Sequence, residues 1–339
     1  MNIYDVAKKA GVSIATVSRV MNGNPNVSRK TRQKVLDVME ESGYTPNVFA
    51  RGLGLNTMHT VGLMCTDSSD PFLANAVYYL ERELRMHGYD SFLCCTGYEL
   101  NTKQKYLELL LSKRVDAIIF VGSSYLEAES SNNAYIINAA TNVPVMLING
   151  FINKPNIYCT LCDDYGSMHD AAMILLEQGK QNILYLYSSK SYSGIQKLKG
   201  FKAAITEKLG HVNEVSIRMC PLSIDIAKEL LKDLTGQGML FDAVIASEDI
   251  LAIGAIKYAK EMSIDIPNAL SIIGYNNSLL ASCSDPELTS IDNHVETLSI
   301  TTVGTLMRVI NGLSAPNKTM ISNNLVIRNT TNFNYQEVR

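Results

Sequence analysis

A short run of small and hydroxyl-bearing residues near the N-terminus is the part of this sequence best suited to contact another surface. Residues 11–20 read GVSIATVSRV and carry a single charge, on Arg19. As a helix, the run would place Val17, Val20 and Met21 on one apolar stripe. A solvated helix would normally carry several Lys and Glu side chains. The rest of this helix offers only hydroxyls, an amide and one guanidinium, which indicates a face that is pressed against something.

The flanking residues predict the elements that hold this face in place. An i, i+3, i+4, i+7 apolar pattern predicts a first helix over residues 3–10, and Gly11 and Val12 then form a tight turn. Ser13 is a suitable N-cap for the second helix. Two short helices joined by a turn with Gly are typical of a helix-turn-helix, although an ordinary three-helix domain would share this outline.

A third helix completes this N-terminal segment. Ser28 would cap it, the core face would carry Val35, Leu36 and Met39, and Gly43 would end it. Residues 1–57 hold eight Lys or Arg against four acidic residues, whereas the whole chain has a formal charge of −3. A small basic segment on an acidic body is the pattern of a nucleic-acid-binding protein, in which phosphate contacts supply much of the affinity.

The motifs of this segment resemble a known family. DVAKKAGVS, ATVSRV, VSRKTR, and GYTPN followed by ARGL are similar to the DNA-binding head of the LacI/GalR family of bacterial regulators. The body is similar more loosely, through DPF at 70–72, KLKGF at 197–201, DILAIG at 249–254 and IIGYNN at 272–277. The resemblance implies a cytoplasmic transcriptional repressor. It would bind a palindromic double-stranded operator as a homodimer under allosteric control by a small molecule.

The resemblance also implies which head residues contact DNA. The second helix would enter the major groove, with base contacts from Ile14, Ala15 and Arg19. A guanidinium is bidentate to guanine, which fits Arg19, while the other two offer apolar contact. The implied phosphate contacts, which fix register only, come from Tyr4, Ser13, Thr16, Ser18, Asn22, Ser28 and Thr31. The alternative for these hydroxyls is ordinary capping and turn chemistry.

Residues 46–59 match the hinge helix that the family places in the minor groove. The matching positions are Asn47, Ala50, Arg51 and Leu53. The resemblance implies that Leu53 wedges into a base step and kinks the duplex. Gly52 and Gly54 flank it, and each disfavours a helix by roughly 1 kcal/mol relative to Ala, so we expect the hinge to be unfolded without DNA. The alternative is a linker that never becomes helical.

From residue 60 onward, short apolar runs alternate with helical stretches. The predicted strands are Val61–Thr66, Ser91–Thr96, Ala117–Gly122, Val145–Asn149, Ile183–Tyr187, Val215–Met219, Ala243–Ser247 and Ser271–Tyr275. The predicted helices are Phe72–His87, Lys103–Ser112, Ser167–Gln178, Ile195–Leu209, Asp225–Leu234 and Ile250–Met262. This alternation predicts parallel sheets with helices on both faces, and so many strands indicate two lobes around a cleft.

The predicted body resembles the two-lobed periplasmic-binding-protein fold, which the family uses for effector binding and dimerisation. The domain boundaries are then 1–45 for the helix-turn-helix, 46–59 for the hinge and 60–339 for the body. The first lobe would hold residues 60–150 and 293–318, and the second 155–285 and 321–339. Chain crossings are expected near 149–154, 285–292 and 318–322. The dimer interface would involve Ile253 and the helix of residues 72–87.

Position by position, the resemblance implies an effector pocket in the cleft. Its residues would be Phe72, Asn149, Lys197, Glu248 and Asn276, together with Asp70, Asp163, Tyr192 and Leu222. The family usually has Arg at the position of Lys197 and Asp at that of Asn276, so an Arg–Asp clasp on sugar hydroxyls is absent.

We therefore expect a carbohydrate-derived effector. Lys197 favours a sugar acid or sugar phosphate, while Glu248 opposes one. The alternatives are a phosphoprotein corepressor, or no small-molecule effector, with these polar residues merely satisfying one another.

Other classes of function find little support in the sequence. The five His are scattered, and GxSxG, HExxH and a GxGxxG after a strand are all missing, so we predict no catalytic residues, no cofactor and no metal. A sugar-binding protein or enzyme on this fold is the remote alternative. Cys159 and Cys162 form a CxxC that we interpret as reduced thiols. No apolar run approaches a membrane span, and we expect neither a signal peptide nor a tetramerising tail.

Overall fold

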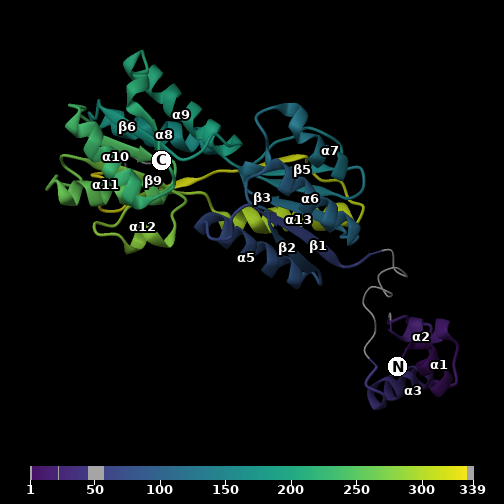
Figure 1. Ribbon diagram of the computed structural model, residues 1–339. Coiled ribbons are helices and arrows are strands. Elements are labelled where there is room, and N and C mark those ends of the chain that lie inside the picture. The colour runs from purple at the N-terminus through teal and green to yellow at the C-terminus, as the bar shows by residue number, and fades with distance from the viewer. Residues whose placement is uncertain (1, 22, 45–56, 334–339) are drawn as a thin grey trace. The chain divides into compact units, whose positions relative to one another are not determined.

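The computed structural model describes residues 2–21, 23–44 and 57–333, and these divide into two compact units. The first unit comprises Met1–Thr60 together with Arg114–Asp116, and the second holds the rest of the chain (Figure 1). We call the helical part of the first unit, residues 2–44, the head, and the second unit the body. The predicted boundary between hinge and body, after residue 59, lies one residue before the division after Thr60.

The head is a three-helix unit: α1 (Ile3–Ala10), α2 (Ile14–Met21) and α3 (Arg29–Glu41). Its core is formed by six buried side chains, Val6, Ala7, Ala10, Val17, Val20 and Val35. Gly11 has a φ of 62°, a left-handed conformation that glycine adopts without strain, and this lets the chain turn from α1 toward α2. The predicted helix-turn-helix geometry of residues 3–21 is therefore present.

Side-chain caps fix the starts of the second and third helices. The hydroxyl of Ser13 accepts the N–H of Thr16, and that of Ser28 accepts the N–H of Thr31, each at 3.2 Å. Both predicted N-caps are confirmed. The predicted core face of α3 was wrong at Leu36, whose side chain is 42% exposed, because Val35, Val38 and Met39 already fill the space against α1 and α2. The prediction that Gly43 ends the helix is confirmed: α3 runs to Glu41, Ser42 is the C-cap, and Gly43 follows with a left-handed φ of 59°.

The body contains two six-stranded sheets, each the centre of one lobe. The first sheet has the order β11-β5-β4-β3-β1-β2, and the second β12-β10-β9-β8-β6-β7. The first-lobe strands are β1 (Thr60–Cys65), β2 (Asp90–Cys95), β3 (Ala117–Val121), β4 (Val145–Ile148), β5 (Ile157–Cys162) and β11 (Lys318–Ile321). The second-lobe strands are β6 (Ile183–Tyr187), β7 (Ile217–Met219), β8 (Ala243–Ala246), β9 (Ser271–Tyr275), β10 (Thr289–Asp292) and β12 (Asn324–Val326).

Helices cover these sheets. Those of the first lobe are α5 (Pro71–Met86), α6 (Leu100–Ser112), α7 (Ala134–Ala139) and α13 (Val295–Ile310), with short 3₁₀ turns at Ser123–Tyr125 and Ser130–Asn133. Those of the second lobe are α8 (Asp164–Glu177), α9 (Tyr192–Leu209), α10 (Ile224–Gly236), α11 (Asp249–Glu261) and α12 (Leu279–Cys283), with a 3₁₀ turn at Glu214–Ser216. The predicted two-lobed α/β fold with parallel sheets is confirmed.

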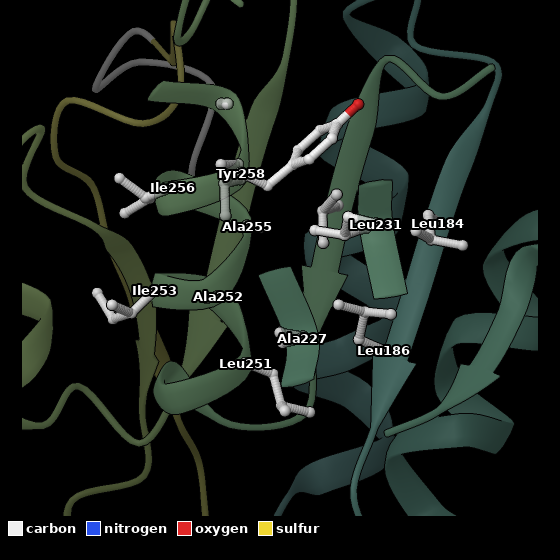
Figure 2. Close-up of a cluster of buried hydrophobic side chains, with 14 of the residues drawn as sticks. Leu184, Leu186, Ala227, Leu231, Leu251, Ala252, Ile253, Ala255, Ile256 and Tyr258 are labelled. Carbon is white, nitrogen blue, oxygen red and sulfur yellow. The ribbon is translucent and has the colours of Figure 1, made fainter. Parts of the chain in front are cut away.

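The inner strands β1, β3, β4 and β8 are buried on both faces, as parallel sheets under helices require, whereas the edge strands are partly exposed. In the second lobe, alternate residues of β6 and β8 point to opposite sides of the sheet. Leu184 and Leu186 pack with α10 and α11 on one side (Figure 2), whereas Ile183 and Tyr185 pack with α8 and α9 on the other. Ile253, predicted as an interface residue, is 8% exposed and belongs to the first of these clusters, and its contribution to a dimer surface stays a prediction.

The chain passes between the lobes at different points from those predicted. The first crossing was expected at 149–154, but β5 follows that segment and pairs with β4 and β11 in the first sheet. The chain therefore enters the second lobe only after Cys162. The second crossing comes after β10, at residues 293–294, just beyond the predicted 285–292. The third lies at residues 322–323, between β11 and β12, at the end of the predicted segment.

A close approach of two helices leads to the first testable prediction. Gly200 of α9 lies against α8, and a Cβ placed there would overlap the backbone carbonyl oxygen of Tyr165. Because backbone cannot move aside like a flexible side chain, Gly200→Ala should lower the free energy of unfolding by about 1–3 kcal/mol. Gly304→Ala in α13 is the matched control, since nothing lies within 4 Å of its Cβ. It should be neutral or stabilising by about 0.5–1 kcal/mol. Equal urea midpoints for the two variants would contradict this packing.

Candidate functional site

A cavity of about 340 Å³ lies in the body between the two lobes. Its lining comes from residues that directly follow strands of both sheets: Gly122 after β3, Asn149 after β4, Ser188 after β6, Ser247 and Glu248 after β8, and Asn276 after β9. Ligands of open parallel sheets bind at this carboxyl edge, because the strand ends and the helix starts converge there. The cavity therefore lies where the fold places binding sites.

The structure brings seven of the nine predicted pocket residues to this cavity. They are Asp70, Phe72, Asn149, Lys197, Leu222, Glu248 and Asn276. Asp163 is not among the lining residues, because its carboxylate caps α8 and accepts the N–H of Gly166 at 2.9 Å. Tyr192, the first residue of α9, is also outside the lining.

Several lining residues escaped prediction from the sequence. They are Leu73, Tyr98, Gly122, Ser123, Ser124, Asp164, Ser188, Ser189, Ser191, Ser193, Gly194, Ser247, Tyr275 and Asn293. The serines looked like ordinary loop residues, but the start of α9 brings several of them together. The one available signal was the cluster of serines at 188–193 directly after a predicted strand.

Lys197 is the centre of the cavity's electrostatics. Its side chain is 5% exposed, and its ammonium donates to the carbonyl of Ser247 at 3.0 Å. The same ammonium lies 3.7 Å from a carboxylate oxygen of Glu248 and 3.6 Å from the centroid of the Tyr275 ring, a cation–π geometry. The positive charge of Lys197 is therefore already engaged by protein groups.

Glu248 begins a chain of side-chain hydrogen bonds along the cavity wall. The amide nitrogen of Asn276 donates to Glu248, and the amide nitrogen of Asn293 donates to Asn276 at 2.8 Å. Burial raises the pKa of Glu248 to about 7, against the opposing effect of the Lys197 charge. The side chain of Glu248 is 25% exposed and forms part of the cavity lining.

A second acidic group lies deeper. Asp164 is 4% exposed and accepts the phenol of Tyr275, whose oxygen in turn accepts the Asn323 amide at 2.8 Å. Burial raises the pKa of Asp164, and Lys197 counteracts that shift. Burial also raises the pKa of Asp70, the N-cap of α5. Three carboxyl groups thus line a cavity in which Lys197 is the single cation among the described lining residues.

The described residues contain no candidate metal centre. Within residues 2–21, 23–44 and 57–333, no three His, Cys, Asp or Glu side chains are grouped to hold a metal. Cys159 and Cys162 are both free and buried in β5, and their thiols face different carbonyls, those of Ile152 and Asn293. Over the same part of the chain, no helix is both long and apolar enough to cross a membrane.

The head presents the predicted DNA-contact residues on one exposed helix and its surroundings. Ile14, Ala15 and Arg19 are exposed on α2, and Tyr4 is 67% exposed on α1. Ser13 with Thr16, and Ser28 with Thr31, form hydroxyl pairs at 2.9 Å that cap helices. Ser18 is half-buried. Five further predicted contacts, Asn22, Asn47, Ala50, Arg51 and Leu53, lie outside the described residues.

Comparison with known proteins accounts for both units. The family model for bacterial regulatory proteins of the lacI family matches residues 2–47. The model for periplasmic binding proteins and the sugar binding domain of the LacI family matches residues 58–336. An HTH-type transcriptional regulator of Lachnoclostridium phytofermentans is 67% identical over 333 residues, covering 98% of this chain and 100% of that protein.

More distant relatives share the same organisation. The HTH-type transcriptional regulator DegA of Bacillus subtilis is 34% identical, and the match covers 97% of each chain. Among solved structures, the lac repressor dimer bound to operator and the anti-inducer ONPF has a TM-score of 0.88 at 24% identity, covering 97% of this chain and 98% of that one. A transcriptional regulator CelR–cellobiose complex has a TM-score of 0.71 at 23% identity, covering 97% and 99%.

A helix-turn-helix head joined to a two-lobed α/β body defines a DNA-binding transcriptional regulator. The chain belongs to the LacI family of bacterial regulatory proteins.

Proposed function

We propose that this regulator is a cytoplasmic repressor that binds a palindromic operator as a homodimer, under the control of a small carbohydrate-derived effector in the interlobe cavity. The exposed face of α2 carries the proposal, because Ile14, Ala15 and Arg19 project from it while Val17 and Val20 are buried beneath. One such helix reads only a few base pairs. Two heads related by two-fold symmetry therefore require a symmetric site.

The operator contact is tested by two kinds of substitution. Arg19→Ala should relax the preference at one base position and weaken operator binding by about 1–3 kcal/mol, because a bidentate contact to guanine is lost. Lys30→Ala, in the first turn of α3, should weaken binding to all DNA sequences alike and reduce the dependence of that binding on salt. Selection from randomised duplexes, with binding measured at several salt concentrations, separates the two effects. An unchanged preferred sequence for Arg19→Ala would place the recognition face elsewhere.

The proposed dimer has apolar surface available on the body. Tyr78 on α5 is 57% exposed, and Ile226 on α10 and Leu279 on α12 are also exposed. Sedimentation at micromolar concentration tests the assembly directly, and a monomer that still binds the operator tightly would overturn the dimer proposal. The proposed fold-on-binding hinge at 46–59, with Leu53 in the minor groove, stays a prediction because residues 45–56 lie outside the described part of the chain.

The effector proposal rests on the polar lining of the cavity. Serine hydroxyls, asparagine amides and carboxylates converge there with the aromatic rings of Phe72 and Tyr98, a combination that suits a sugar ring and its hydroxyls. A ligand at a hundred times its dissociation constant should stabilise the folded chain by about 2.7 kcal/mol. Thermal melting with neutral sugars, sugar acids and sugar phosphates measures this, with operator affinity recorded in parallel. If no member changes either quantity, a phosphoprotein corepressor or constitutive binding takes the effector's place.

A further inference from the structure

The charge of the interlobe cavity is opposite to what its single lysine suggests. Asp70, Asp164 and Glu248 line it together with one cation, Lys197. The Lys197 ammonium is engaged by the Ser247 carbonyl, the Glu248 carboxylate and the Tyr275 ring. A ligand anion would therefore meet more carboxyl groups than free cationic donors, and its desolvation would go uncompensated.

The hydrogen-bond chain on the cavity wall points the same way. The amide nitrogen of Asn276 donates to a carboxyl oxygen of Glu248, which turns the amide oxygen of Asn276 away from it. The oxygen of Asn276 then faces Asn293, which must donate through its own nitrogen. This order leaves the amide oxygen of Asn293 buried and without a donor from the described part of the chain, on a residue that lines the cavity.

That oxygen has no hydrogen-bond partner among the described residues, although Asn293 is 2% exposed and lines the cavity. An unpaired buried acceptor destabilises the protein, so a donor from a ligand would be favourable here. The unpaired oxygen of Asn293 indicates a ligand that donates hydrogen bonds, and the acidic lining indicates one that carries positive rather than negative charge.

We propose that the effector cavity takes a carbohydrate that bears a protonated amine, with an amino sugar as the simplest example. The inference rests on the proposed effector function and narrows it to one class of ligand. The ammonium would lie among Asp70, Asp164 and Glu248, and ligand N–H or O–H groups would supply the donor that Asn293 lacks. This amine-bearing class of ligand replaces the sugar acid or sugar phosphate that the sequence suggested.

The test is a matched panel on the full chain at neutral pH. Glucosamine, galactosamine and mannosamine are each compared with the parent hexose, the N-acetylated form and the hexose 6-phosphate, by thermal melting and calorimetry. At least one amine should bind about tenfold or more tightly than its parent and its N-acetylated form, the amount expected for a hydrogen bond to a charged group. The matching phosphate should give no shift.

A charge-removing variant checks the origin of any preference. Glu248→Gln keeps the size of the side chain and an acceptor for Asn276, and it should reduce the amine-to-parent affinity ratio by about tenfold. Glu261→Gln, at the far end of the helix that Glu248 precedes and outside the cavity, should keep the ratio. A retained ratio in Glu248→Gln would overturn the proposal.

The panel separates failure of this inference from failure of the proposed function. Tighter binding of a parent hexose or a phosphate, with a change in operator affinity, would overturn the amine preference and leave effector control standing. A panel in which no amine binds would overturn the amine preference as well. Operator binding by the unmodified chain is a separate measurement. Only the absence of that binding would contradict the DNA-binding function.

Discussion

Lys197→Met should lower the free energy of unfolding of the body by about 3–5 kcal/mol at about pH 8. The substitution preserves much of the side-chain volume but removes a cation. In the unmodified protein this cation lies 3.7 Å from Glu248, whose negative charge it balances, and it also counteracts the raised pKa of Asp164. Carboxyl groups with too little solvent and no counter-charge are then left in the cavity wall. Urea unfolding followed by circular dichroism measures the loss.

The size of this loss should depend on pH. A carboxyl group without its counter-ion takes up a proton instead of remaining charged, so the loss should shrink toward about pH 5. Lys202→Met on the same helix is the control, because its partner Glu214 is 69% exposed and such surface pairs contribute about 0–1 kcal/mol. A loss equal for the two lysines, or constant with pH, would show that Lys197 does not balance the cavity carboxyls.

The elements of this fold were largely predictable because their signals are local. Apolar runs of five or six residues marked β6 and β9, and Ser13 and Ser28 marked two helix starts. The crossings between lobes were less predictable. The segment FINKPN at 151–156 looks like a linker, but it is a turn before β5, and only pairing with the distant β11 assigns that strand to the first sheet.

The residues of the cavity likewise divide into those that the sequence could predict and those that it could not. Residues directly after strands, such as Asn149 and Asn276, were found because the family resemblance assigns them to the pocket and the fold class places strand ends at the binding edge. Asp163 and Asp164 differ by one position, yet the first caps α8 and the second reaches the cavity, a distinction that depends on where the helix begins. The charge balance around Lys197 was not predictable, since Asp164, Tyr275 and Glu248 come from three separate elements.

Glu248→Gln should change how stability varies with pH. Burial raises the pKa of Glu248 from 4.5 to about 7, so the protonated form is the one that the folded chain favours. For such a group the contribution to stability is complete below the unfolded pKa and is lost as the pH rises through the folded pKa. The stability of the unmodified protein relative to Glu248→Gln should therefore fall by about 3 kcal/mol between about pH 5 and about pH 8.

The direction of the Glu248 pKa shift depends on the balance between burial and the charges of its neighbours. Lys197 on α9 lowers its pKa, while Asp70 at the start of α5 and Asp249 on α11 raise it, and burial outweighs the lysine. These groups remain in the variant, so the difference between the two proteins isolates the Glu248 proton. Glu261→Gln, at the far end of α11, is the control: hydrogen bonds from Lys232 and Lys228 lower the pKa of Glu261, so its titration falls below this pH range. A flat difference for Glu248→Gln across the range would mean that this carboxylate stays charged in the folded chain, with Lys197 compensating fully for its burial.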